Sequence, residues 1–119
     1  MNVRVTGVPM DLGADRRGVD MGPSALRYAE LSETVESLGY GCKDTGNLPV
    51  PNPESRDPHS EQPPKGSAKY LKETRTVCHS IESAVADTVA DGDLPLVLGG
   101  DHSIAIGTVR GVSSERDVG

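Results

Sequence analysis

The order of elements along the chain predicts an α/β protein built on a parallel β-sheet. Short apolar stretches at residues 3–8 and 94–98 are typical of buried strands. Between them, two segments have the apolar periodicity of helices, residues 23–38 and 67–91. A weaker strand is expected over residues 40–45. Strands that alternate with helices pair in parallel, because each helix carries the chain back across the sheet. We therefore expect three strand–helix units, which amount to one half of a doubly wound sheet.

The first strand, Val-Arg-Val-Thr-Gly-Val at residues 3–8, should be moderately buried on both faces and should end at Pro9. Residues 10–22 contain three glycines, several charges and no apolar period, so they are expected to form a loop. Loops of that length in a small domain are usually functional.

A helix is expected to begin at Pro23, because a proline at the first helical position loses no hydrogen bond. Gly39 stands where a left-handed C-terminal cap belongs. The next segment, residues 47–66, holds six of the nine prolines and is expected to be a polar loop. The apolar stripe of the helix repeats at intervals of three and four residues and consists of Tyr28, Leu31, Val35 and Leu38.

A longer helix is expected over residues 67–91, ended by Gly92. The continuous apolar run at residues 94–98, Leu-Pro-Leu-Val-Leu, is typical of a central parallel strand. A last helix should begin at Ile104, with Ser103 as its N-cap. On the long helix the predicted apolar face consists of Leu71, Thr74, Cys78, Ile81, Val85 and Val89, and the opposite face carries Lys69, Glu73, Glu82 and Asp87.

Composition narrows the class of protein. Leu, Ile and Val make up 25 of the 119 residues, and Phe and Trp are absent, so the core must be thin. A net charge of −6 without a basic stripe argues against a nucleic-acid partner. No apolar run approaches the roughly 20 residues that span a bilayer, and the N-terminus has no apolar leader, so we expect a cytoplasmic protein without a membrane partner. Cys42 and Cys78 lack CxxC spacing and are expected to be reduced thiols.

Two loops follow strands where function is expected in an open parallel sheet, at the carboxyl ends of the strands. They are residues 9–22 and residues 99–103. The second loop is the more informative. Its Gly99-Gly100 pair allows a sharp turn and a close approach, and Asp101-His102 then offers a carboxylate beside an imidazole.

Each of these residues also has a structural explanation. Asp101 could bond nearby backbone amides, and a lone histidine such as His102 is more often structural than a metal ligand. Ser103 fits a helix cap better than a nucleophile, because no GxSxG sequence surrounds it. His59 and His79 are expected to face solvent. Considered one by one, the residues leave the function open.

Longer motifs carry a resemblance to a known family. Gly7-Val-Pro-Met-Asp-Leu-Gly13, followed by Arg16-Arg-Gly-Val-Asp-Met-Gly-Pro-Ser-Ala-Leu-Arg27, resembles the opening of the arginases. Leu96-Val-Leu-Gly-Gly-Asp-His-Ser-Ile-Ala-Ile-Gly107 resembles the first metal motif of that family, and Asp44-Thr-Gly-Asn-Leu-Pro49 resembles its second-strand segment. Gly-Gly-Asp-His-Ser is shared with agmatinases and formimidoylglutamases, whereas the opening motifs favour an arginase of the bacterial type.

The resemblance implies a fold, a reaction and roles for three residues. The fold is a three-layer α/β/α sandwich with a parallel sheet and two Mn²⁺ ions at its carboxyl edge, and the reaction is the hydrolysis of L-arginine to L-ornithine and urea. His102 matches a ligand of one manganese, Asp101 a supporting neighbour, and Arg16 a position in the loop that rims the active site. The resemblance also implies a homo-oligomer, a trimer or hexamer, with L-arginine as its small-molecule partner.

The family's remaining ligands come from an Asp-Ala-His-x-Asp motif and a later Asp-x-Asp motif, and neither occurs after His102. Residues 1–112 are therefore expected to be the N-terminal part of an arginase-like domain, with residues 113–119 as a divergent tail. One histidine cannot hold two manganese ions, so we expect the chain alone to be inactive. Two alternatives stay open, namely another ureohydrolase such as an agmatinase, and a non-catalytic remnant.

Overall fold

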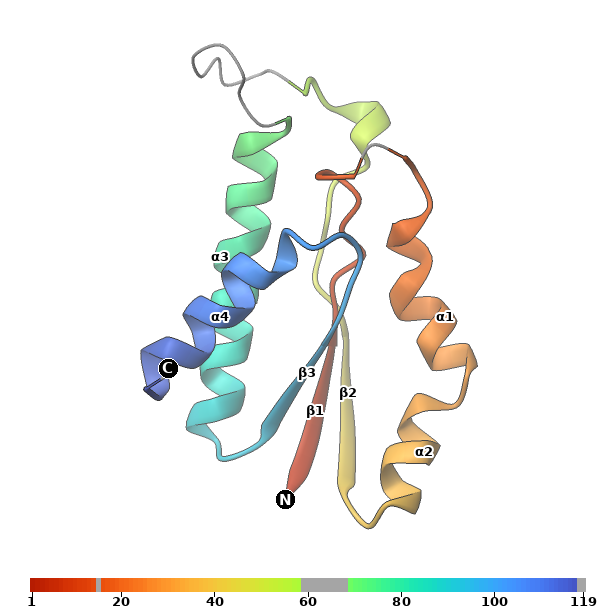
Figure 1. Cartoon of the computed structure of the whole chain (residues 1–119), viewed down its shortest axis with the longest axis vertical. Helices are drawn as coiled ribbons and strands as arrows, with labels where there is room; N and C mark the ends of the chain where they lie inside the picture. Colours follow the sequence, from red (N-terminus) through yellow and green to blue (C-terminus); the bar gives the residue numbers. More distant parts are fainter. Residues whose placement is uncertain (15, 59–68, 118–119) are drawn as a thin grey trace.

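The computed structural model describes residues 1–14, 16–58 and 69–117. Figure 1 shows a parallel sheet of β1 (Asn2–Gly7), β2 (Gly41–Asn47) and β3 (Leu94–Leu98) between two pairs of helices. One pair is α1 (Gly22–Tyr28) and α2 (Leu31–Ser37), and the other is α3 (Leu71–Ala90) and α4 (Ile104–Glu115). Two short 3-10 turns, η1 (Val19–Met21) and η2 (Pro53–Ser55), lie in the connections. The predicted α/β class and its three parallel strands are confirmed.

The sheet has the strand order β2-β1-β3, so the first strand is its centre. Val3 pairs with Cys42 on one side and with Leu94 on the other. Among the described residues β3 lies at the edge of the sheet, and Leu94 is 49% exposed, so the central position predicted for residues 94–98 is not seen in this part of the sheet. A continuous apolar run indicates that both faces of a strand are covered, but it does not indicate the position of the strand in the sheet.

Core clusters lie on both sides of the sheet, and β1 is largely buried between them, as its sequence predicted. Val3 and Val5 pack with Leu98 beneath α2, where Leu31 and Val35 cover them. On the other face, the chain that follows β1 packs against α3. This larger cluster consists of Val8, Met10, Leu12, Val77, Ile81, Val85 and Val89. The first part of the predicted loop 10–22 is thus buried, because Met10 and Leu12 pack against α3.

The single helix expected from Pro23 to Leu38 is two helices. α1 ends at Tyr28 and α2 begins at Leu31, and Glu30 between them has a left-handed backbone with φ of 61°. The break turns the two halves of the predicted stripe in different directions. Leu31 and Val35 pack on the core, whereas Tyr28 is 91% exposed and Leu38 is 69% exposed. Gly39 has the predicted left-handed conformation, with φ of 92°.

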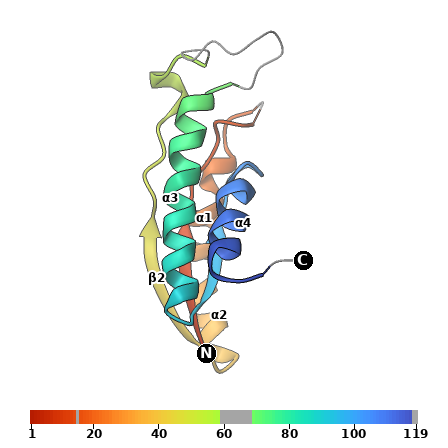
Figure 2. The ribbon, with the colours of Figure 1, turned by 90° about the vertical axis from the view of Figure 1, so that its left-hand side faces the viewer.

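The long helix α3 runs along one face of the sheet (Figure 2) and packs against the larger core cluster. It begins at Leu71, and residues 67–68 of the predicted helix lie outside the described residues. The predicted face is confirmed at Cys78, Ile81, Val85 and Val89, which are buried. The placement of Glu73 on the solvent face was wrong, because Glu73 is 9% exposed. Its helix position lies one turn from Val77, at the boundary of the buried face, and it lines a groove together with residues 49–51 and 55–57.

Of the predicted proline-rich loop 47–66, the structure describes residues 47–58, and His59 lies outside the described residues. At the other end of the chain, α4 continues through Glu115, so residues 113–115 extend a helix. Within the described ranges, no helix is long and apolar enough to cross a membrane.

Candidate functional site

The carboxyl ends of the three strands meet at one end of the sheet, at the top of Figure 1. The chain after β1 and the chain after β3 run side by side there. The backbone N–H of Val8 donates to the carbonyl of Leu98 over 2.8 Å, and the N–H of Asp101 donates to the carbonyl of Met10 over 2.8 Å. The two loops singled out from the sequence are therefore joined to each other along their backbones.

Glycine is required where these loops touch. Gly100 has φ of 69°, and a Cβ at this position would lie 2.5 Å from the carbonyl oxygen of Met10. A Cβ on Gly22, at the start of α1, would lie 2.2 Å from the carbonyl oxygen of Gly99. Neither neighbour can move aside, because both are backbone atoms. The Gly99-Gly100 pair thus serves the close approach that the sequence predicted.

The carboxylate of Asp101 links the two loops a second time. Its Oδ2 accepts a hydrogen bond of 2.8 Å from the backbone N–H of Gly13, in the loop after β1. Its Oδ1 accepts a bond of 2.9 Å from the N–H of Ser103 and another from the Ser103 hydroxyl. The local backbone bonding that the sequence allowed for Asp101 is present, and the bond to Gly13 adds a long-range contact that sequence reasoning missed.

Ser103 precedes α4 as predicted, but it does not act as a side-chain cap. It has helical backbone angles and makes no capping hydrogen bond from its side chain. Its hydroxyl is bonded to Asp101 instead. On the other side of the loop, the buried Cys78 of α3 places its Sγ 3.6 Å from the carbonyl oxygen of Ser103. Burial raises the pKa of the Cys78 thiol, which keeps this side chain neutral and structural.

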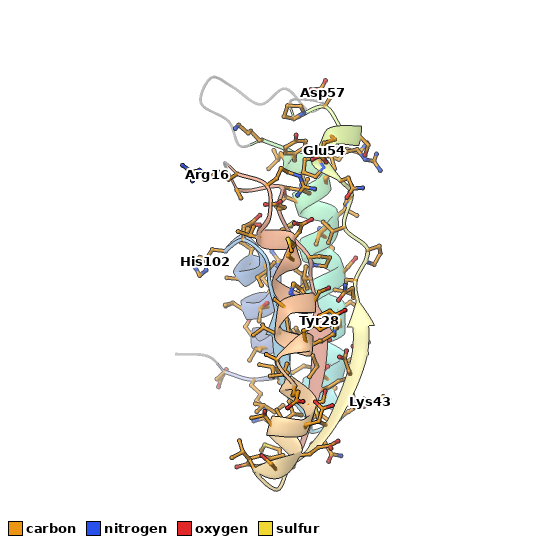
Figure 3. The ribbon with its side chains drawn as sticks, turned by 90° about the vertical axis from the view of Figure 1, so that its right-hand side faces the viewer. Arg16, Tyr28, Lys43, Glu54, Asp57 and His102 are labelled. Carbon is orange, nitrogen blue, oxygen red and sulfur yellow. The ribbon has the colours of Figure 1, made fainter. Side chains whose placement is uncertain are left out.

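His102 is exposed at this edge, one residue beyond the Asp101 contacts. Figure 3 shows His102 and Arg16 projecting from separate loops toward the same side of the molecule. Within the described part of the chain, the imidazole of His102 has no hydrogen bond or ion pair that would occupy its nitrogens. His79, by contrast, is exposed on α3 and lies 3.7 Å from the carboxylate of Glu82, so its predicted solvent position is confirmed.

The neighbouring arginine, Arg17, organises the loop after β1. Its guanidinium contacts the buried carboxylate of Asp11 and donates from Nε to Oε1 of Glu54 over 2.6 Å. The same Asp11 oxygen accepts the N–H of Gly18 over 2.9 Å. These carboxylates raise the pKa of Arg17, and Arg17 lowers the pKa of Glu54. The sequence could not distinguish Arg16 from Arg17, because the two stand side by side in a loop without period.

A manganese ion prefers carboxylate and imidazole ligands, and His102 fits the part of one such ligand. The carboxylate of Asp101 is used for hydrogen bonds within the chain, because both of its oxygens accept them, from Gly13 and from Ser103. Among the described residues, no group of three or more His, Cys, Asp or Glu side chains could hold a metal ion. The described residues thus offer one ligand and do not form a complete metal site by themselves.

Two grooves lie apart from His102. One, of about 810 Å³, lies between residues 49–57 and the first half of α3 and is lined by the buried Glu73. The other, of about 230 Å³, is lined by Arg16 together with Asp11, Arg17 and Tyr70. The second groove adjoins the loop after β1, at the same end of the molecule as His102.

Comparison with known proteins agrees with this geometry. The model of the Arginase family matches residues 1–119. The arginase of Brevibacillus brevis is 46% identical over 112 residues, which cover 94% of this chain and 36% of that protein. The native structure of Bacillus caldovelox arginase superposes with a TM-score of 0.82 at 43% identity, covering 95% of this chain and 36% of that one. An agmatine ureohydrolase of Thermoplasma volcanium is less similar, with a TM-score of 0.67 and 26% identity over 92% of this chain and 33% of that one.

The fold and the two joined loops define an α/β protein of the ureohydrolase type, with an aspartate–histidine pair at the carboxyl edge of its parallel sheet. More narrowly, the chain belongs to the arginase family. It spans about 36% of the length of the curated relatives that it matches.

Proposed function

We propose that the protein that carries these 119 residues is a cytoplasmic, manganese-dependent arginase that hydrolyses L-arginine to L-ornithine and urea. The observation that carries this proposal is the placement of His102. Its imidazole is exposed at the carboxyl edge of the sheet, in a loop held by Asp101, and the surrounding chain is 46% identical to an arginase. The weaker likeness to an agmatine ureohydrolase favours arginine over agmatine as the substrate.

The chemistry of the substrate explains why such a protein needs metal ions. The guanidinium carbon of arginine is deactivated by resonance and by its positive charge, so neutral water attacks it slowly. A bound pair of Mn²⁺ ions supplies a water whose pKa is lowered toward neutrality. In this proposal His102 contributes one neutral imidazole to the pair, and the other ligands come from outside residues 1–119.

The same reasoning assigns separate roles to the chain and to the whole protein. Residues 1–119 bring one ligand and the loop framework that holds it, so by themselves they do not catalyse the reaction. A chain with a single manganese ligand cannot satisfy the several ligands that each ion requires.

We also propose that the whole protein forms a homo-oligomer, a trimer or a hexamer.

The test compares the whole protein with the 119-residue chain, each freed of metal and then supplied with Mn²⁺. We expect urea from L-arginine with the whole protein and none with the chain alone. In the whole protein, His102→Asn should lower kcat/KM for arginine by about 100-fold or more, because a direct ligand contributes at least as much as the residues that support one. His79→Asn, at an exposed histidine away from the edge, is the matched control and should leave kcat/KM unchanged.

Each outcome bears on a separate part of the proposal. Equal losses in the two histidine variants would remove His102 from the metal site. Urea from agmatine but not from arginine would move the protein to the agmatinases. Mn²⁺-dependent urea release by the 119-residue chain would overturn the assignment of activity to the whole protein.

A further inference from the structure

The strongest unassigned feature is the set of hydrogen bonds around Asp101. This residue contacts the loop after β1 through both its main chain and its side chain. Its N–H donates to the carbonyl of Met10, and its Oδ2 accepts from the N–H of Gly13, each over 2.8 Å. The two partners are three residues apart, so the contacts fix both the position and the direction of that loop.

The second carboxylate oxygen acts within its own loop. Oδ1 accepts from the backbone N–H and from the hydroxyl of Ser103, the residue on the far side of His102. His102 is therefore flanked by two restrained residues. Asp101 is hydrogen-bonded to Met10 and Gly13, and Ser103 is hydrogen-bonded to Asp101. Its backbone has little freedom, while its side chain stays exposed.

The packing around this carboxylate is close. A Cβ on Gly13 would lie 3.1 Å from Oδ1 of Asp101, tighter than ordinary van der Waals contact. If Asp101 only formed a local turn with Ser103, the residue at position 13, which is 88 positions away in the sequence, would not need to be glycine. The close contact at Gly13 thus distinguishes a bridge between two loops from a local turn.

We propose that Asp101 is the positioning residue of the carboxyl-edge site, whose carboxylate bridges the two loops and holds the His102 imidazole in its place. Its connection with catalysis rests on the function proposed above. In this proposal Asp101 acts through the backbone and hydroxyl donors that engage both of its oxygens, and not as a metal ligand. All the atoms that form the bridge belong to residues 10–13 and 101–103.

Asp101→Asn, made in the whole protein, tests the bridge to Gly13 separately from the local turn with Ser103. The amide retains one carbonyl oxygen, which can accept from Ser103, but its NH₂ group faces the N–H of Gly13 and cannot accept that bond. Hydrogen exchange should become at least about tenfold faster at the Gly13 amide and change little at the Ser103 amide. The NMR resonances of the His102 ring should shift or broaden. Mn²⁺ affinity should fall by about 10- to 100-fold, and kcat should fall while KM for arginine stays nearly constant.

Two further variants complete the experiment. Asp93→Asn is the matched control: Asp93 is also a hydrogen-bonded carboxylate, which accepts from Arg4 over 2.6 Å, but it lies at the opposite end of the sheet, so none of these readouts should change. Gly13→Ala, which crowds the bridge without removing the carboxylate, should reproduce the changes in His102 and in Mn²⁺ affinity in weaker form.

Unchanged Gly13 exchange in Asp101→Asn would overturn the bridge. Faster Gly13 exchange with unaltered His102 resonances and Mn²⁺ affinity would show that the bridge exists and does not position the histidine. If the unmodified whole protein neither binds Mn²⁺ nor hydrolyses arginine, the proposed function fails, and the Gly13 exchange and the His102 resonances still decide whether Asp101 positions His102.

Discussion

At the scale of single residues, the clearest ion pair outside the candidate site joins α1 to β2. Nε and Nη2 of Arg27 donate to the two oxygens of Asp44 over 2.7 and 2.9 Å, and Nη1 donates to Asn47 over 2.6 Å. This two-point contact lowers the pKa of Asp44 below its ordinary value of 3.8. Such planar contacts between arginine and carboxylate are stronger than single-point surface pairs.

The pair should make stability depend on pH. Because the folded pKa of Asp44 is lowered, its contribution is present above pH 3.8 and is lost as the pH falls through the lower, folded value. Arg27→Gln should reduce the free energy of unfolding by about 0.5–1 kcal/mol at pH 7, and by less at pH 2. Denaturant titrations between pH 7 and pH 2 measure this difference. In Arg116→Gln, a control at an exposed arginine just after α4, the pH slope should match that of the unmodified protein, and a matching slope in Arg27→Gln would contradict the assignment.

Glu73 is a residue whose burial reduces stability. Its side chain is 9% exposed, and among the residues that the structure describes its Oε2 has no hydrogen-bond partner. Burial of a carboxylate without a partner is unfavourable, so Glu73→Leu should raise the free energy of unfolding by about 1–3 kcal/mol. Equilibrium denaturation measures the change. Glu82→Leu, on the same helix but paired with Arg110 at the surface, should change it by less than about 0.5 kcal/mol. A loss of stability in Glu73→Leu would mean that this carboxylate has a partner in solution.

Residue by residue, the sequence could identify the chemistry of the site but not its contacts. Asp101 and His102 stand out because a carboxylate and an imidazole follow a glycine pair at the end of a strand. The bond from Gly13 to Asp101 spans 88 positions, and nothing in either segment indicates that it forms. Glu73 was misplaced for a related reason, since helical period locates the middle of a buried face better than its boundary.

At the scale of elements, helices and strands could be predicted where the apolar period is long or the strand is strongly apolar. α3 and β3 are examples. The division between α1 and α2 could not be predicted, because the apolar period continues across Glu30 while its backbone turns left-handed. Residues other than glycine and asparagine rarely adopt that conformation, so composition alone does not signal it.

The contact between α3 and α4 depends on two glycines one helical turn apart. A Cβ on Gly107 would lie 2.5 Å from the carbonyl oxygen of Cys78 and 2.8 Å from Cβ of Ile81. Gly111, four residues later, is equally close to Glu82 and Val85. The small residues allow the two backbones to approach each other directly.

Gly107→Ala therefore tests two opposing effects. Alanine improves helix propensity by about 1 kcal/mol, while crowding against backbone that cannot move costs about 1–3 kcal/mol. We expect the crowding to dominate and the free energy of unfolding to fall, as measured by denaturant titration. Ser113→Ala, at an exposed position of the same helix, should leave stability unchanged or slightly increased. A gain of stability in Gly107→Ala would show that the helices can separate without loss.

At the scale of the whole molecule, the order of strands and helices was sufficient to predict the fold class. The place of each strand in the sheet was not predictable, because apolar composition is alike in a covered edge strand and a central strand. The thin core expected from the composition takes the form of two clusters, one on each side of the sheet. The buried chain after β1 supplies Val8, Met10 and Leu12 to the larger cluster, and these side chains compensate in part for the absence of Phe and Trp.

The central position of β1 also has a consequence for the time course of folding. β1 leaves the ribosome before both of its neighbours: Val3 pairs with Cys42 of β2 on one side and with Leu94 of β3 on the other. Pairing across such sequence distances is slow, because closing a long loop must precede any gain from the contact. During synthesis β1 can first pair with β2 alone, and its second edge stays open until β3 has been made. The newly made chain is therefore most exposed to aggregation through β1 in this interval, and a chaperone that covers extended apolar segments would act there.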